Sequence, residues 1–231
     1  MNRHPPIIPA EAPPAPAGWT TTRYDDDVLA VRGHIMRRRF ASKPVVFFGS
    51  SSFRNWHRMA EDLGSLEIAN LGFGGGTAES GLRYCDDLLD LVEPRRIVLY
   101  FGENDIANDG LDAKSAFAAL QRLTQRLRDK FGEVPIDRLS IKHSPGRWIY
   151  TGEFDAFNAM LAESHMDGEP GGYVDVCSCL IGQNGRPMGR YYEADGVHLN
   201  SLGYSLWAGV IAGLLGLVAG AQVVSPPGPS R

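Results

Sequence analysis

Four short polar or glycine-rich segments contain the side chains in this sequence that could do chemistry. They are Gly49-Ser50-Ser51-Ser52, Asn70 to Gly76, Gly102-Glu103-Asn104-Asp105 and Asp195-Gly196-Val197-His198. Each segment alone has an ordinary structural explanation, because serine caps helices and glycine makes turns. Together they supply hydroxyl nucleophiles, backbone and amide donors, and a carboxylate beside an imidazole. Acyl transfer requires this set of groups.

The spacing of these groups suggests a role for each of them. A serine hydroxyl is a weak nucleophile and needs a base within hydrogen-bond reach. His198 is the candidate base, and Asp195, three residues earlier, can orient its imidazole through one turn. The oxyanion of the tetrahedral intermediate needs donors already in place, and Gly75 N–H, the Asn104 amide and the N–H of the nucleophile can supply them. The residues alone leave three adjacent serines, 50 to 52, as candidate nucleophiles.

The apolar pattern predicts a sheet that would hold these segments together. Strands are expected at 45–48, 66–69, 97–101, 139–142 and 173–176. Helices are expected at 24–40 and 113–131, and within 76–92 and 148–166. The first and third strand candidates are nearly continuous apolar runs, as in the centre of a parallel sheet. The alternation predicts an α/β fold, a three-layer α/β/α sandwich with a five-stranded parallel sheet, in which ligands bind beyond the carboxyl ends of the strands.

Composition narrows the class of protein. The 231 residues include 23 Lys and Arg against 27 Asp and Glu, a formal net charge of −4, which argues against nucleic acid as the main partner. Cys85, Cys177 and Cys179 are an odd number, which makes a poor disulfide framework or zinc site and favours free thiols in a reducing compartment. The first residues lack the apolar segment of a signal peptide, so a cytoplasmic location is expected.

One domain is expected at 19–224, between a proline-rich arm at 1–18 and a flexible tail at 225–231. The segment 199–224 has no charged residue and approaches the roughly 20 apolar residues that span a bilayer. We interpret its beginning as the last helix of the sandwich, because Tyr204 and Trp207 follow His198 so closely. No membrane role is therefore expected. The oligomeric state is left open, with a homodimer as one option.

Five blocks, in this order, resemble those of the SGNH hydrolases, the GDSL-type esterase and lipase superfamily. The blocks are Phe48 to Phe53 with Trp56, Asn70 to Gly75, Gly102 to Asp105, Ser140 to Trp148, and Asp195 to Trp207. The resemblance covers about 45–207, and it implies a flavodoxin-like sandwich that hydrolyses esters or thioesters. Such a mechanism needs no metal and no cofactor.

The resemblance also implies which residue does what. It identifies Ser51 as the nucleophile, Asp195 and His198 as its partners, and Ser51 N–H, Gly75 and Asn104 as the oxyanion hole. The alternation of side chains at a strand end also favours Ser51. Related sequences usually have Asp where Ser50 stands, but that Asp is not the triad carboxylate.

Substrate contacts are harder to assign from the sequence. Phe73 and Arg147 are candidates, although Phe73 also fits a hydrophobic core and Arg147 also fits a structural ion pair. His143 stands where related sequences often have Pro and is given no role.

We therefore expect a serine esterase with a small-molecule substrate, acting through an acyl-enzyme on Ser51. No long lid insertion separates the blocks, and an open site suits short acyl groups, including acetyl esters of sugars or small alcohols. Thioesterase, lysophospholipase or acyltransferase activity at the same site are open alternatives. A non-enzymatic flavodoxin-like binding module is disfavoured, because the glycine loops lack a phosphate-binding motif.

Overall fold

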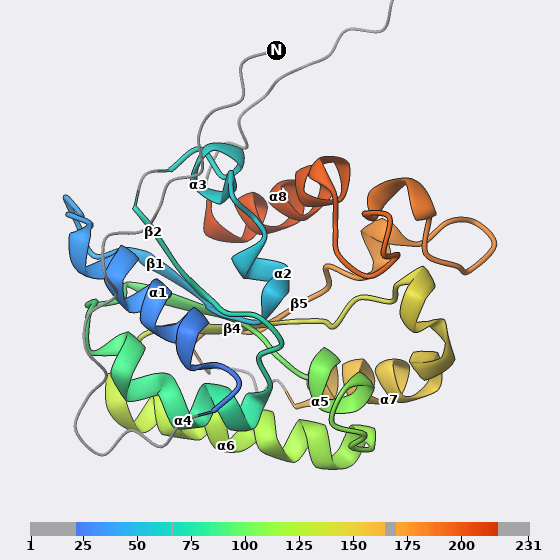
Figure 1. The fold of residues 1–231 in the computed structure, drawn as a ribbon, viewed down its shortest axis with the longest axis horizontal. Helices are drawn as coiled ribbons and strands as arrows, with labels where there is room; N and C mark the ends of the chain where they lie inside the picture. Colours follow the sequence, from blue (N-terminus) through green and yellow to red (C-terminus); the bar gives the residue numbers. More distant parts are fainter. Residues whose placement is uncertain (1–21, 66, 165–169, 217–231) are drawn as a thin grey trace, which may run out of the picture.

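The structure is a computed structural model that describes residues 22–65, 67–164 and 170–216. Its five strands are parallel and form one sheet in the order β2-β1-β3-β4-β5 (Figure 1). The strands are β1 Val45–Gly49, β2 Ile68–Gly72, β3 Arg96–Tyr100, β4 Ile136–Leu139 and β5 Tyr173–Val174. The α-helices are α1 Asp25–Arg37, α2 Ser51–Arg54, α3 Met59–Asp62, α4 Ala78–Leu89, α5 Glu103–Ala107, α6 Ala113–Phe131, α7 Thr151–Glu163 and α8 Ser201–Leu215. Three 3₁₀ helices, η1 Pro145–Tyr150, η2 Ser178–Leu180 and η3 Gly189–Tyr191, lie in the connections.

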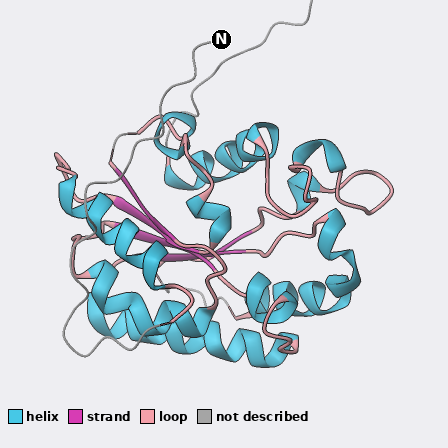
Figure 2. Cartoon of the chain, viewed as in Figure 1, coloured by secondary structure: helices cyan, strands magenta, loops and turns pink. Residues whose placement is uncertain are grey.

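Helices cover both faces of the sheet, which confirms the predicted three-layer α/β/α sandwich (Figures 1 and 2). The residues of β1 alternate between the two layers, as a pleated strand requires. Val46 and Phe48 pack in the core with α1, α4, α6 and α7. Val45 and Phe47 pack in the second core with α2, α3 and α8. Strand β1 is therefore buried on both faces, which explains its unbroken apolar sequence.

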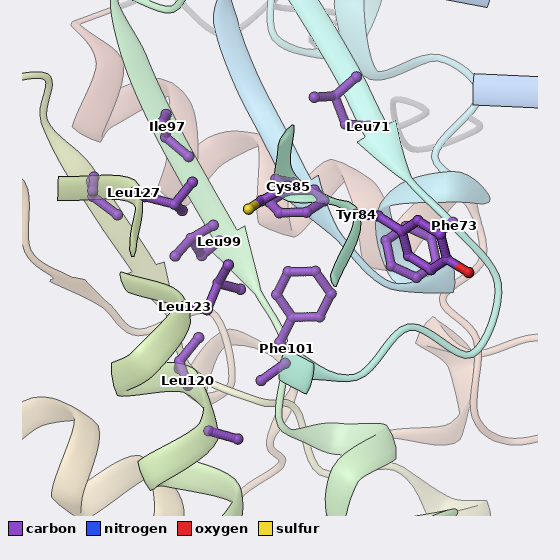
Figure 3. Packing of buried hydrophobic residues seen from close by; sticks show 14 of the residues in the cluster. Leu71, Phe73, Tyr84, Cys85, Ile97, Leu99, Phe101, Leu120, Leu123 and Leu127 are labelled. Atoms are coloured by element: carbon purple, nitrogen blue, oxygen red, sulfur yellow. The ribbon is translucent and has the colours of Figure 1, made fainter. Parts of the chain in front are cut away.

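A stripe of leucines on α6 and residues of α4 pack against the sheet in the first core (Figure 3). Leu120, Leu123 and Leu127 recur at steps of three and four on α6, and all are at most 2% exposed. Phe73 and Tyr84 lie in the same core, with ring centroids 6.1 Å apart. Both rings are at most 1% exposed, so they contribute to packing.

The observed elements differ from the predicted ones mainly at their ends. Helix α6 has the predicted bounds, whereas α1 stops at Arg37 and β2 runs on to Gly72. Strand β4 begins three residues before the predicted 139–142 and ends at Leu139. It ends there because the amide of Asn158 takes over both backbone groups of Ile141, with Oδ1 to N and Nδ2 to O distances of 2.8 Å.

The apolar C-terminal segment begins as the helix that closes the second core. In α8, Tyr204 and Trp207 are at most 6% exposed, and Trp207 Nε1 donates to the carbonyl of Val176 at 3.0 Å. Within the described ranges, no helix has the length and apolar character needed to cross a membrane. The predicted arm at 1–18 and tail at 225–231 lie outside the described residues.

Candidate active site

The sheet order places the carboxyl ends of β1 and β3 side by side, at the point where the order of strands along the chain reverses in the sheet. Strand β1 lies between β2 and β3, and such sheets bind ligands beyond the carboxyl ends at this point. Ser51 begins α2 directly after β1, and Asn104 follows β3 in α5. Ser50 N–H joins the two strand ends by donating to the Tyr100 carbonyl at 3.2 Å. Gly49 permits this approach, because a Cβ there would lie 2.7 Å from the same oxygen.

Three side chains form a hydrogen-bonded chain at this edge of the sheet. His198 Nε2 lies 3.0 Å from Ser51 Oγ, and His198 Nδ1 lies 2.6 Å from Asp195 Oδ2. A base takes a hydroxyl proton over such a distance, and a carboxylate so placed fixes the tautomer of the imidazole. The His198 side chain is 30% exposed and so accessible from solvent. The structure thus brings together the three residues that the sequence grouped as a triad.

The position of His198 is fixed by the segments on either side of it. Its carbonyl accepts a hydrogen bond from Glu193 N–H at 2.8 Å. Two residues later, Asn200 Oδ1 caps α8 by accepting from the N–H groups of Leu202 at 3.0 Å and Gly203 at 3.2 Å. Asparagine is among the preferred residues at a helix start. The start of α8 and the location of the imidazole are therefore coupled.

The Asp195 carboxylate is held in its charged form. Its Oδ1 accepts hydrogen bonds from the N–H groups of Val197 at 2.8 Å and His198 at 3.0 Å. Partial burial raises the pKa of Asp195, but the hydrogen bonds from His198 and Val197 outweigh it and lower this pKa to about 2. The charged carboxylate can stabilise an imidazolium on His198.

The predicted oxyanion donors lie at the same edge of the sheet. Gly75, in the loop after β2, has a φ of +67°, and its N–H has no acceptor among the residues that the structure describes. Asn104 is 4% exposed and donates through Nδ2 to the Gly76 carbonyl at 3.0 Å, which leaves its second amide proton available. Ser51 is the first residue of α2, where backbone N–H groups have no partner within the helix.

The other two serines of the run face different surroundings. Ser50 and Ser52 are each 2% exposed, and Ser52 Oγ lies 3.4 Å from the buried Lys142 Nζ. Of the three hydroxyls, that of Ser51 contacts His198. The geometry therefore favours Ser51, the same serine that the resemblance to the family identifies as the nucleophile.

Beside Asn104 lies a buried ion-pair network. The sequence allowed an ion pair for Arg147 but did not identify Glu103 and Lys142 as its other members. Glu103 Oε2 accepts from Lys142 Nζ and Tyr100 Oη, both at 2.7 Å, and Oε1 accepts from Arg147 Nη1 at 3.1 Å. Burial lowers the pKa of Lys142. Burial alone would raise the pKa of Glu103, but attraction to Lys142 and Arg147 outweighs it and lowers that pKa. A lysine inside a strand-like apolar run was the available sequence signal, because buried lysines need a partner.

Asp105, which had no role predicted from the sequence, makes a second set of buried hydrogen bonds. Its two carboxylate oxygens accept from Ala78 N–H at 2.9 Å and from Gly102 N–H at 3.0 Å. Burial raises the pKa of Asp105 to about 6. The carboxylate links the start of α4 to the start of α5, and thus the loop of Gly75 to the segment of Asn104.

The two candidates for substrate contact are both engaged within the protein. The ring of Phe73 has no exposed surface, so we assign it to the core. Arg147 bonds to Glu103, to Asn104 Oδ1 at 3.1 Å and to Asn108 Oδ1 at 3.0 Å, and its side chain is 15% exposed.

His143, which had no predicted role, is hydrogen-bonded to two residues of α7. Its Nε2 lies 2.8 Å from Asp155 Oδ1, and its Nδ1 lies 2.9 Å from Thr151 Oγ1. The described residues contain no cluster of three or more His, Cys, Asp or Glu side chains suited to a metal ion, and the three cysteines are free thiols.

Comparisons with known proteins bear on the family and on the fold. The model of the GDSL-like lipase/acylhydrolase family matches residues 17–206. No curated protein sequence matches the chain.

Three solved structures are similar to the chain. A structure from Streptococcus pneumonia, named for platelet activating factor, has a TM-score of 0.67 at 22% identity, over 83% of this chain and 94% of that one. A GDSL-like lipase from Bacteroides thetaiotaomicron has a TM-score of 0.63 at 18% identity, over 75% and 88%. A carbohydrate esterase family 3 protein from Talaromyces cellulolyticus has a TM-score of 0.59 at 17% identity, over 75% and 96%.

Proposed function

The chain belongs to the GDSL-like lipase/acylhydrolase family and is a serine hydrolase of ester bonds, and from that premise we propose that it cleaves short-chain carboxylic esters through an acyl-enzyme on Ser51. One observation carries the proposal, the contact chain from Ser51 Oγ through His198 to Asp195 at 3.0 and 2.6 Å. A hydroxyl joined in this way to a base and its orienting carboxylate is an activated nucleophile.

Each group has one task in the proposed reaction. His198 Nε2 takes the proton of Ser51 as Oγ attacks the ester carbonyl, and the carbonyl oxygen becomes an oxyanion. The N–H groups of Ser51 and Gly75 and the amide of Asn104 stabilise that charge. His198 then protonates the oxygen of the departing alcohol, which leaves the acyl group on Ser51. Water, activated by the same imidazole, attacks the acyl-enzyme and releases the acid.

A short acyl group is supported by the packing of the nearby aromatic residues. Phe53, Phe73 and Tyr84 are at most 1% exposed and belong to the two cores. Rings without exposed surface cannot wall a channel for a long acyl chain. The similarity to a carbohydrate esterase family 3 protein agrees with esters of sugars as a substrate class.

A panel of p-nitrophenyl esters from acetyl to palmitoyl tests the proposal, with the matching thioesters and sugar acetates beside it. We expect the acetyl ester to have the highest kcat/KM and Ser51→Ala to remove essentially all turnover. Ser50→Ala and Ser52→Ala are matched controls that keep measurable activity. A fluorophosphonate adduct mapped by mass spectrometry to Ser50, or a panel maximum at long chains, contradicts the proposal.

A further inference from the structure

A pocket of about 520 Å³ begins at His198. It lies between the segment from α2 to α3 and the start of α8. Its lining includes Asn55, Trp56, Glu193 and Tyr204. Asn55 is four residues after Ser51, and its N–H donates to the Ser51 carbonyl at 2.9 Å. Residues four apart lie on the same side of a helical turn, so the pocket extends from the side of α2 that also carries Ser51.

The chemistry of ester cleavage determines which part of the substrate lies beside His198. The imidazole that takes the Ser51 proton must return a proton to the oxygen of the departing alcohol. That oxygen is therefore within reach of His198 Nε2, and the rest of the alcohol extends to the same side. Helices α4 and α5, which follow the predicted oxyanion donors, belong to the other layer of the sandwich, whereas α2, α3 and α8 enclose the pocket.

The floor of the pocket is aromatic, and its polar atoms are already used. The rings of Trp56 and Tyr204 are stacked, with centroids 5.2 Å apart and an interplanar angle of 15°. Trp56 Nε1 donates to Asp62 Oδ2 at 2.8 Å, and Tyr204 Oη donates to the Ser52 carbonyl at 2.9 Å. Trp56 is 1% exposed and Tyr204 is 6% exposed, so the two rings shape the base of the pocket and offer a ligand no hydrogen bond.

The polar groups available to a ligand lie around this floor. Among the described residues, the side chains of Asn55 and Glu193 have no hydrogen-bond or ion-pair partner, although both line the pocket. The Asn55 amide supplies donors and an acceptor, and the Glu193 carboxylate can accept from two hydroxyls. An unpartnered amide and carboxylate, above a base that offers no hydrogen bond, suit an alcohol with several hydroxyls.

The same features argue against a cationic or a wholly apolar alcohol. An ammonium group would need an open ring face, but the Trp56 and Tyr204 rings stack on each other. An apolar alcohol would strip water from Asn55 and Glu193 without replacing the hydrogen bonds.

We infer that this pocket binds the alcohol part of the ester, that the alcohol is a sugar or similar neutral polyol, and that Asn55 and Glu193 select it. The inference rests on the proposed function, because it takes His198 as the group that protonates the leaving oxygen. Asn55 and Glu193 then act on specificity and have no part in the bond-making steps.

Substrates with a constant acetyl group and a varied alcohol test the inference: a monoacetylated xylose or glucose, phenyl acetate and acetylcholine. We expect Glu193→Gln and Asn55→Ala to raise KM for the sugar acetate at least tenfold, while kcat/KM for phenyl acetate changes less than twofold. Glu163→Gln, an exposed substitution near the end of α7, is the matched control and should change neither substrate.

The outcomes separate this inference from the function on which it rests. If phenyl acetate is cleaved in a Ser51-dependent way but the variants affect all esters equally, or none, the pocket assignment is wrong and the esterase stands. Preference of the unaltered enzyme for acetylcholine or phenyl acetate over the sugar acetate also overturns the assignment. If no acetate is cleaved in a Ser51-dependent way, both proposals fail.

Discussion

Nη1 of Arg147 lies 3.1 Å from Oδ1 of Asn104 and 3.1 Å from Oε1 of Glu103. A guanidinium can only donate hydrogen bonds, so it fixes which end of the Asn104 amide faces it. Asn108 Nδ2 donates to the same Asn104 oxygen at 3.1 Å. The amide nitrogen is thereby directed to the Gly76 carbonyl at 3.0 Å, with its second proton left for an oxyanion. Arg147 is a positioning residue for the proposed oxyanion hole.

Arg147→Met should therefore lower kcat about tenfold and leave KM nearly unchanged. The loss of a whole oxyanion donor costs roughly 10²- to 10³-fold in kcat, which Asn104→Ala should reach. With Arg147 replaced, the amide is still present but is free to rotate, so the loss is smaller. Steady-state kinetics on a short-chain ester measure both values.

Two further variants distinguish positioning from substrate binding. Arg186→Met is a matched control, because the Arg186 guanidinium lies 4.9 Å from the Trp148 ring and has no contact with Asn104. Arg147→Lys keeps a cation near Glu103 but lacks the forked donor set, so it should restore thermal stability more than kcat. A raised KM at constant kcat in Arg147→Met would mean that Arg147 contacts substrate.

The Glu103–Lys142 pair predicts a large effect on stability. Lys142→Met leaves Glu103, which is 3% exposed, without its nearest cation. Breaking one side of a buried ion pair costs roughly 3–5 kcal/mol of unfolding free energy, or about 10 °C in Tm for a domain of this size. The double variant Glu103→Gln with Lys142→Met should lose less than Lys142→Met alone. A double variant at least as unstable as Lys142→Met shows that the two charges are not coupled.

The fold was largely predictable because its signals are local. Apolar runs such as 45–48, and the stripe of leucines on α6, follow from the periodicity of strands and helices. The end of β4 was not predictable, since it depends on the Asn158 side chain capturing the backbone of Ile141 from 17 positions away. Strand ends set by a distant side chain leave no local signal.

In the candidate site, too, some residues could be predicted from the sequence and others could not. Ser51, Asp195 and His198 stand in short blocks whose order and spacing are visible in the sequence. The role of Arg147 was not visible, because its contact with Asn104 joins residues 43 positions apart. Sequence alone left Arg147 between substrate contact and ion pair, and only the three-dimensional arrangement shows what it touches.

Asp195 leads to a prediction about pH. Its pKa of about 2 is below the ordinary value of 3.8, so its contribution to stability is present above about pH 4 and lost as pH falls toward 2. The Tm difference between the unaltered protein and Asp195→Asn should therefore shrink over pH 4 to 2. Thermal unfolding in a series of buffers measures it, and a constant difference contradicts the prediction.

The same carboxylate should matter for catalysis throughout the neutral range. Asp195→Asn should lower kcat roughly 10²- to 10⁴-fold with little change in KM, because the imidazole loses the group that fixes its tautomer. His198→Ala should be about as damaging as Ser51→Ala, since the members of such a unit act together. Steady-state kinetics on a short-chain ester measure these losses, and substantial activity in His198→Ala argues against His198 as the base.

Gly75 provides the last test, because there is space for a side chain but not a suitable backbone conformation. A Cβ at Gly75 would lie 3.9 Å from the Tyr24 ring, which is an ordinary contact. The obstacle is its φ of +67°, since a non-glycine residue in the left-handed region costs roughly 1–2 kcal/mol. In Gly75→Ala, the loop either keeps this conformation at that cost or relaxes and turns its N–H away from the oxyanion.

Gly75→Ala should thus lower Tm by a few degrees and, where the loop relaxes, lower kcat roughly 10- to 100-fold with KM little changed, because one oxyanion donor is misplaced. Gly216→Ala is the matched control: Gly216 caps α8 with a φ of +63° and has no atom within 4 Å of an added Cβ. It should lower Tm similarly and leave kcat unchanged. Unfolding curves and kinetics on both variants measure this. Equal kcat in the two variants, with a loss of Tm in Gly75→Ala well below that in Gly216→Ala that marks a relaxed loop, would remove Gly75 from the proposed oxyanion hole.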